Sequence, residues 1–116
     1  YELESYQTQS GNKIKAMSMV TLSKNGKQLV EAATGEGPID ASFNAINKML
    51  SRDYKLVFYN IKAVTGGTDA LGEVRVRISD GEREYIGKGI STDIIESSIK
   101  AYINAINRAD INICEQ

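Results

Sequence analysis

The stretch VRVRISDGEREYIGKGISTDIIESSIKAYINAIN, residues 74–107, decides the fold. At its start Val74, Val76 and Ile78 alternate with arginines, a pattern typical of a half-buried strand. Asp80-Gly81 then favours a type I′ hairpin turn, and residues 82–86 are expected to form the returning strand. The rest of the stretch has apolar residues at helical spacing, so two paired strands followed by a helix are predicted.

The predicted helix of this stretch has recognisable start signals and two apolar stripes. Ser91, Thr92 and Asp93 are candidate caps, and Asp93 with Glu96 resembles a capping box. One stripe has large side chains and the other mostly small ones: Ile95, Ile99, Tyr102 and Ile106, then Ile94, Ser98, Ala101 and Ala105. Two stripes predict a helix that is buried on more than one side.

The sequence repeats itself around this stretch. Gly35-Glu36-Gly37 is echoed by Gly87-Lys88-Gly89, 52 residues later, and each glycine pair is expected to lead into a helix. Asn44-Ala45-Ile46-Asn47 is echoed by Asn104-Ala105-Ile106-Asn107, 60 residues later, which makes the second helix about two turns longer.

The first copy contains the same predicted elements. Strands are expected at residues 3–8, along a longer segment with Ile14, Ala16, Val20 and Leu22 on one face, and at 28–33 after an Asn25-Gly26 turn. Pro38 near the first position opens a helix, whose stripe is Ile39, Phe43, Ile46 and Leu50. Residues 56–64 form the opening strand of the second copy.

The predicted fold class is therefore α+β, with two βββα units in a pseudo-twofold relation and helices packed on small antiparallel sheets. Each unit alone is too small to bury a good core. We therefore expect one domain over residues 1–116, with repeat one at about 1–52 and repeat two at about 53–116.

Composition excludes several classes of function. The 116 residues include no His and a single Cys, Cys114, which rules out a Cys/His zinc site, a Ser-His-Asp triad and a His-activated thiol. The net charge of -1, with scattered cations, argues against nucleic acid or an anionic membrane as the main partner. No signal peptide or apolar stretch of membrane-spanning length is visible, and a lone cysteine fits the cytoplasm. Because the chain begins at Tyr1, it is interpreted as a piece of a longer polypeptide.

The residues themselves offer one candidate binding site. Asp40, Asp69, Asp80, Asp93 and Glu96 fall at turns or helix starts, where capping explains them better than acid–base catalysis. Gly35-Glu36-Gly37-Pro38 lets backbone N–H groups at the positive end of a helix approach an anion, such as the carboxylate of a free amino acid. The alternative is that this segment is only a tight turn and a cap. Residues 66–69 are interpreted as a loop.

Three motifs, taken in order, extend this interpretation. They are the segment from Gly35 to Ala41, the segment from Gly67 to Val74, and Gly87-Lys88-Gly89 with Ser91 to Glu96 and Lys100-Ala101-Tyr102. In this order and spacing the chain resembles the regulatory domain of the 2-isopropylmalate synthase and citramalate synthase family over nearly its whole length. One departure is Ser97-Ser98, where the family more often has Ala-Ser.

The resemblance implies an allosteric, non-catalytic domain that needs no cofactor and binds leucine, giving feedback inhibition of leucine biosynthesis. The acyltransferase activity, 2-isopropylmalate synthase, would lie in a metal-dependent TIM barrel of the same polypeptide, which is absent from this chain. The implied partners are leucine, that barrel and a second copy in a homodimer. The alternatives are an isoleucine-sensing domain of citramalate synthase and a non-catalytic interaction module.

The resemblance also implies an effector site, carried over by position. Its residues would be Gly35, Glu36, Gly37, Ile39, Asp40, Leu56, Tyr59, Ala63, Ala70, Ile90, Ser91, Thr92 and Ile94. The helix-start N–H groups would bind the carboxylate, a carbonyl or acid would bind the ammonium group, and Leu56, Tyr59, Ala63 and Ala70 would hold the aliphatic side chain. Because Leu56, Tyr59 and Ala63 are spaced i, i+3 and i+7, a bulge or twist in their strand is predicted. Small Ala63 leaves depth, which favours leucine over isoleucine.

Overall fold

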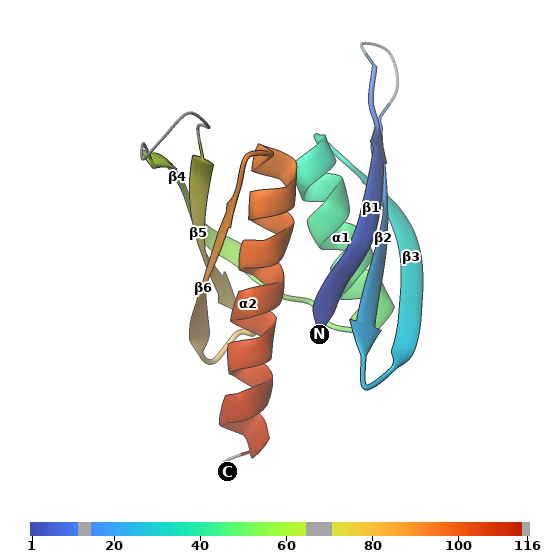
Figure 1. The fold of residues 1–116 in the computed structure, drawn as a ribbon. Helices are drawn as coiled ribbons and strands as arrows, with labels where there is room; N and C mark the ends of the chain where they lie inside the picture. The colour runs from blue at the N-terminus through green and yellow to red at the C-terminus, as the bar shows by residue number, and fades with distance from the viewer. Residues whose placement is uncertain (12–14, 65–70, 115–116) are drawn as a thin grey trace. The chain divides into compact units, whose positions relative to one another are not determined.

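The computed structural model describes residues 1–11, 15–64 and 71–114, except for the side chains of 112–114. The chain forms two compact units, Tyr1–Asp53 and Tyr54–Gln116. Each unit is a three-stranded antiparallel sheet followed by one helix that packs on it (Figure 1). The predicted α+β class with two βββα units is therefore confirmed.

Unit 1 contains β1 (Glu2–Gln9), β2 (Ala16–Lys24), β3 (Lys27–Gly35) and α1 (Pro38–Leu50), with β2 in the centre of the sheet. Asn25 and Gly26 join β2 to β3 with φ of 53° and 81°, the two positive φ angles of the predicted type I′ turn. Alternate β2 residues, among them Val20 and Leu22, are fully buried. Ile14, predicted on this strand face, lies outside the described residues.

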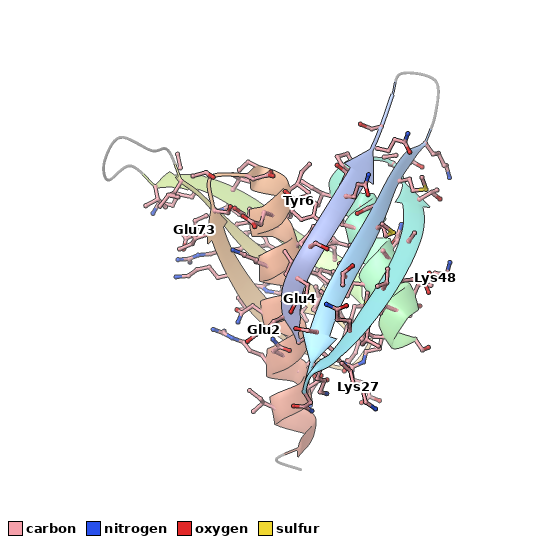
Figure 2. All side chains as sticks on the ribbon, turned by 45° about the vertical axis from the view of Figure 1, so that its right-hand side comes forward. Glu2, Glu4, Tyr6, Lys27, Lys48 and Glu73 are labelled. Atoms are coloured by element: carbon pink, nitrogen blue, oxygen red, sulfur yellow. The ribbon has the colours of Figure 1, made fainter. Side chains whose placement is uncertain are left out.

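Helix α1 begins at Pro38 and ends at Leu50, and its C-cap Ser51 has a left-handed backbone. Its Phe43 and Ile46 are buried, and α1 packs mainly on β3 and β2. Lys48, labelled in Figure 2, ties the last turn to β3 because its Nζ lies 3.6 Å from a Glu31 oxygen and donates to Ala32 O. Of the predicted stripe, Phe43 and Ile46 are in the core of unit 1, whereas Ile39 and Leu50 are only half-buried.

Unit 2 contains β4 (Lys55–Val64), β5 (Leu71–Ser79), β6 (Glu84–Ser91) and α2 (Ile94–Cys114), with β5 in the centre of the sheet. Helix α2 has 21 residues against 13 in α1, so it is about two turns longer, as predicted. It packs on β6 and β5. Within the described parts of the chain, neither helix is long and apolar enough to cross a membrane.

The loop between β5 and β6 differs from the prediction. Ser79 pairs with Glu84, so the loop has four residues rather than the two of a type I′ turn, and β6 begins later than residue 82. The cause is the Asp80 carboxylate, whose Oδ1 accepts from the backbone N–H groups of Glu82 at 2.9 Å and Arg83 at 2.7 Å. These hydrogen bonds from Arg83 and Glu82 hold the pKa of Asp80 below its usual value.

The second glycine pair also differs from the prediction. Gly87 and Gly89 are buried inside β6, and α2 begins five residues after Gly89, following the N-cap Asp93. A Cβ on Gly87 would lie 2.0 Å from Ala101 O, and one on Gly89 would lie 2.2 Å from Ser97 O. These glycines therefore let the helix backbone approach the strand. In unit 1, Gly35 ends β3 and Gly37 is the N-cap of α1.

The start of α2 uses the predicted residues in a different arrangement. Asp93 Oδ1 accepts from Ile95 N at 2.9 Å and so caps the helix. Glu96 accepts a hydrogen bond from Ser91 Oγ, which itself accepts from Asp93 N. Both predicted stripes contain fully or nearly fully buried residues: Ile99, Tyr102 and Ile106, and Ser98, Ala101 and Ala105.

We predict that Gly87→Ala destabilises the chain by about 1–3 kcal/mol, because the new methyl group would overlap the backbone of α2. Gly37→Ser is the matched control, since a Cβ there meets nothing within 4 Å and serine is a favoured N-cap. Urea denaturation of both variants measures the difference. Equal midpoints for Gly87→Ala and the parent chain would show that α2 does not depend on this close approach.

Candidate functional site

The first group of predicted site residues lies where β3 passes into α1. Asp40 Oδ2 accepts from Glu36 N at 3.0 Å, so this carboxylate ties down the loop in front of its own helix. Gly35 is buried beneath it, and a Cβ on Gly35 would lie 2.6 Å from Asp40 Oδ2 and from Ala41 N. Asp40 therefore has the local structural role predicted for the acids at helix starts.

Gly37, two residues further on, has open space around it. It is the N-cap of α1, with φ of -150°, and no side chain caps the helix there. A Cβ at this position meets nothing within 4 Å. Because the first-turn N–H groups of a helix favour a negative charge, this open start is suited to an anion.

The second group lies on β4, which contains a bulge. The pairing of β4 with β5 shifts between Leu56 and Phe58, so Val57 is an extra residue in β4. Beyond it, Tyr59 pairs with Val76 and Ala63 with Gly72. The bulge that the i, i+3, i+7 spacing predicts is confirmed, and it puts Leu56, Tyr59 and Ala63 on one face of the strand.

This face of β4 is the side on which α2 packs, yet the helix does not cover it. The β5 partners Val76 and Ile78 are fully buried, and α2 packs on β5 and β6. On β4, however, Leu56 is 44% exposed, Ile61 is 47% exposed and Ala63 is exposed. We call Leu56, Tyr59, Ile61 and Ala63 the β4 strip. The residues predicted for the site from the sequence did not include Ile61, although its position two residues after Tyr59 places it on the same face.

Tyr59 connects the β4 strip to α2. Its hydroxyl lies 2.5 Å from Ser98 Oγ, and Ser98 donates to Ile94 O at 2.7 Å. Ile94 also packs near the other end of the strip, since its Cδ1 lies 2.6 Å from where a Cβ of Gly72 would be, and Gly72 pairs with Ala63. The start of α2 is thus linked to Tyr59 through Ser98, and Ile94 lies near Gly72, the partner of Ala63.

The remaining predicted residues take different positions. Ser91 is buried at the end of β6 and bonds the first turn of α2, while Thr92 is exposed beside it. Ile90 is 43% exposed on the opposite sheet face, because β6 alternates and its neighbours Gly89 and Ser91 face the helix. The structure therefore does not bring Ile90 to the β4 strip. Ala70 lies outside the described residues.

The opposite face of this sheet carries an ion-paired carboxylate. Glu73, labelled on β5 in Figure 2, is buried although it points away from α2, and its Oε1 lies 3.3 Å from Lys88 Nζ and 3.6 Å from an Arg75 nitrogen. The hydrogen bond from Lys88, with the charge of Arg75, holds the pKa of Glu73 below its usual value. A carboxylate with a lowered pKa stays ionised at neutral pH, so Glu73 has a structural rather than a proton-donating role.

Comparison with known proteins identifies the family of this chain. The model of the LeuA allosteric (dimerisation) domain matches residues 1–110. The chain is 51% identical over 99% of its length to a 2-isopropylmalate synthase of Ruminiclostridium cellulolyticum, and 43% identical over 93% of its length to one of Pelotomaculum thermopropionicum. It covers 23% and 22% of those two proteins, so it spans about a fifth of the relatives that it matches. The resemblance found in the sequence is confirmed, and the chain belongs to the LeuA allosteric (dimerisation) domain family.

Proposed function

We propose that this chain is the leucine-binding regulatory domain of a 2-isopropylmalate synthase and that leucine binding gives feedback inhibition. The observation that carries the proposal is the β4 strip, an uncovered apolar surface that a bulge aligns beside α2. The family description, allosteric and dimerisation, supports both a regulatory role and a homodimer. Catalysis would belong to another part of the full-length protein, and the single cysteine fits a cytoplasmic protein.

Each group of residues has a distinct role in the proposed site. The open start of α1 at Gly37 binds the effector's carboxylate, because backbone N–H groups and the helix dipole both favour an anion there. Glu36 and Asp40, both exposed acids, are the candidates for the ammonium group. Leu56, Tyr59 and Ala63, with Ala70 and Ile94, hold the aliphatic side chain, whose burial contributes about 1.5–3 kcal/mol. Gly35, Ile39, Ser91 and Thr92 shape the two helix starts.

Leucine is favoured over isoleucine as the effector for two reasons. The curated relatives reported above are 2-isopropylmalate synthases, whose name belongs to the leucine branch. The exposed Ala63 also leaves depth at its end of the β4 strip for a side chain that branches at Cγ. The alternatives are an isoleucine-sensing domain and an interaction module, and the interaction module would have no saturable amino-acid site.

Isothermal titration calorimetry of this 116-residue chain with leucine, isoleucine and valine tests the proposal. We expect saturable binding of leucine, with weaker binding of isoleucine and valine because they fill the apolar strip less deeply. Absence of heat or saturation with leucine would exclude the sensor and favour the interaction module. Tighter binding of isoleucine than of leucine would instead favour the citramalate branch.

Gly37→Asp is expected to abolish leucine binding while the chain stays folded. The new carboxylate would occupy the position proposed for the effector's carboxylate, whereas the extended backbone and open space at Gly37 accept a side chain without strain. Gly37→Asn has the same size and also caps helices well, but it carries no charge. Calorimetry should therefore show a larger loss for aspartate than for asparagine, and unchanged leucine affinity in Gly37→Asp would move the carboxylate site elsewhere.

Ala63→Ile is expected to change which amino acid binds best. Three extra carbons would fill the deep end of the β4 strip, so leucine affinity should fall about tenfold or more, while isoleucine, which branches at Cβ, should lose less or gain. Because Ala63 is exposed in unit 2, the melting temperature should change little. Titration of both ligands against both proteins gives the ratio of affinities. An unchanged leucine-to-isoleucine ratio would remove Ala63 from effector selection.

A further inference from the structure

Ser42 and Ser98 occupy equivalent positions in the two units. Each is the fifth residue after the N-cap of its helix, Gly37 in α1 and Asp93 in α2, and each is fully buried. Each hydroxyl donates to the carbonyl four residues earlier at 2.7 Å, Ser42 to Pro38 and Ser98 to Ile94. Because a hydroxyl has one proton, each serine is then left as an acceptor for a second hydrogen bond.

The two units supply that second hydrogen bond from different strands. In unit 1 it comes from Ser18 on the central strand β2, at 2.7 Å. The equivalent residue on the central strand of unit 2 is Val74, which has no hydroxyl. The strand pairing gives this equivalence. Ser18 lies two residues after Ala16, the partner of Gly35, and Val74 lies two residues after Gly72, the partner of Ser91. In unit 2 the hydroxyl of Tyr59, on the edge strand β4, donates to Ser98 Oγ instead.

The hydrogen bond to Ser98 fixes the side chain of Tyr59, which belongs to a strand that α2 does not cover. Tyr59 is half-buried, while its neighbours on the β4 strip are exposed. A phenol that lacked Ser98 would be solvated by turning its hydroxyl toward water, and the ring would leave its place against α2. The hydrogen bond to Ser98 therefore fixes the orientation of the ring before any ligand arrives.

We propose that Ser98 is a positioning residue of the effector site. Its hydroxyl holds the Tyr59 ring against α2, so that the ring forms a preorganised wall for the aliphatic side chain of the effector. This role rests on the proposed leucine site. It also connects the site to the first turn of α2, because the same hydroxyl bonds Ile94 O. Preorganisation raises affinity by removing the cost of ordering the side chain on binding.

A double-mutant cycle on the full 116-residue chain tests the role. Ser98→Ala and Tyr59→Phe each remove the same hydrogen bond, so each should weaken leucine binding about five- to tenfold in calorimetry, and the double variant should be no weaker than the worse single variant. Ser18→Ala is the matched control, because it removes the equivalent buried bond of unit 1. It should lower the melting temperature about as much as Ser98→Ala while leaving leucine affinity unchanged.

A second measurement observes the hydrogen bond itself in ligand-free protein. In the chain labelled with ¹³C-tyrosine, the Cζ resonance of Tyr59 is identified as the one that Tyr59→Phe removes. This resonance should shift in Ser98→Ala and keep its position in Ser18→Ala. A parent chain that does not bind leucine would refute the proposed function, and the positioning role with it. If the parent chain binds leucine, three results would overturn the role of Ser98 alone. These are additive losses of leucine affinity in the double variant, a Tyr59 Cζ resonance that does not shift in Ser98→Ala, or equal weakening of leucine binding by Ser18→Ala and Ser98→Ala. If Ser98→Ala does not fold, unchanged leucine affinity in Tyr59→Phe would overturn it as well.

Discussion

The close approach of α2 to β6 is the contact on which the rest of unit 2 depends. Gly87 and Gly89 are buried directly beneath the helix backbone, at positions where any side chain would collide with it. Because the helix lies this near to β6, it packs on β6 and β5 and leaves the corresponding side of β4 uncovered. The candidate effector surface is therefore a consequence of where two glycines allow a helix to lie.

Unit 1 has the same topology with a different contact. The residues of β3 that correspond in pairing to Gly87 and Gly89 are Glu31 and Ala33, opposite Val20 and Ser18. Glu31 pairs with Lys48 of α1, and the close backbone approach of α1 is at Gly35, the last residue of β3. The repeated scaffold thus supports different features, an open helix start in unit 1 and an uncovered apolar strip in unit 2, from the same order of strands and helix.

The sequence predicted the features that local patterns determine. Asn25-Gly26 gave the correct turn because its backbone preferences suffice, and the uneven spacing of Leu56, Tyr59 and Ala63 required a bulge that the structure contains. Asp80-Gly81 was predicted wrongly, because the side chain of Asp80 stabilises a longer loop. The two glycine pairs were both expected to lead into a helix, but Gly87 and Gly89 lie inside β6, whereas Gly35 ends β3 and Gly37 is the N-cap of α1.

The hydrogen bond between Tyr59 and Ser98 was beyond the reach of sequence patterns. It joins residues 39 positions apart, and Ser98 was predicted only as a member of the helix stripe of mostly small side chains. The reason why Tyr59 is the partner of Ser98 becomes evident when the two units are compared by strand pairing. Val74 lies at the position where unit 1 has Ser18, so the central strand of unit 2 offers no hydroxyl. Ile61 was missed because it belongs to the strip through the corrected register of β4 rather than through any motif.

The central claim is the proposal that leucine binding involves the β4 strip in unit 2 and the open start of α1 in unit 1. Titrating leucine into the ¹⁵N-labelled chain and following each assigned backbone amide by NMR tests it most directly. The account predicts the largest shifts at residues 56–63, at the start of α1 near Gly37 and in the first turn of α2, with little change at Met17 and Met19 on the far face of the first sheet. The largest shifts at Met17 and Met19, or around the shallow depression that Arg83 and Arg108 line, would contradict it.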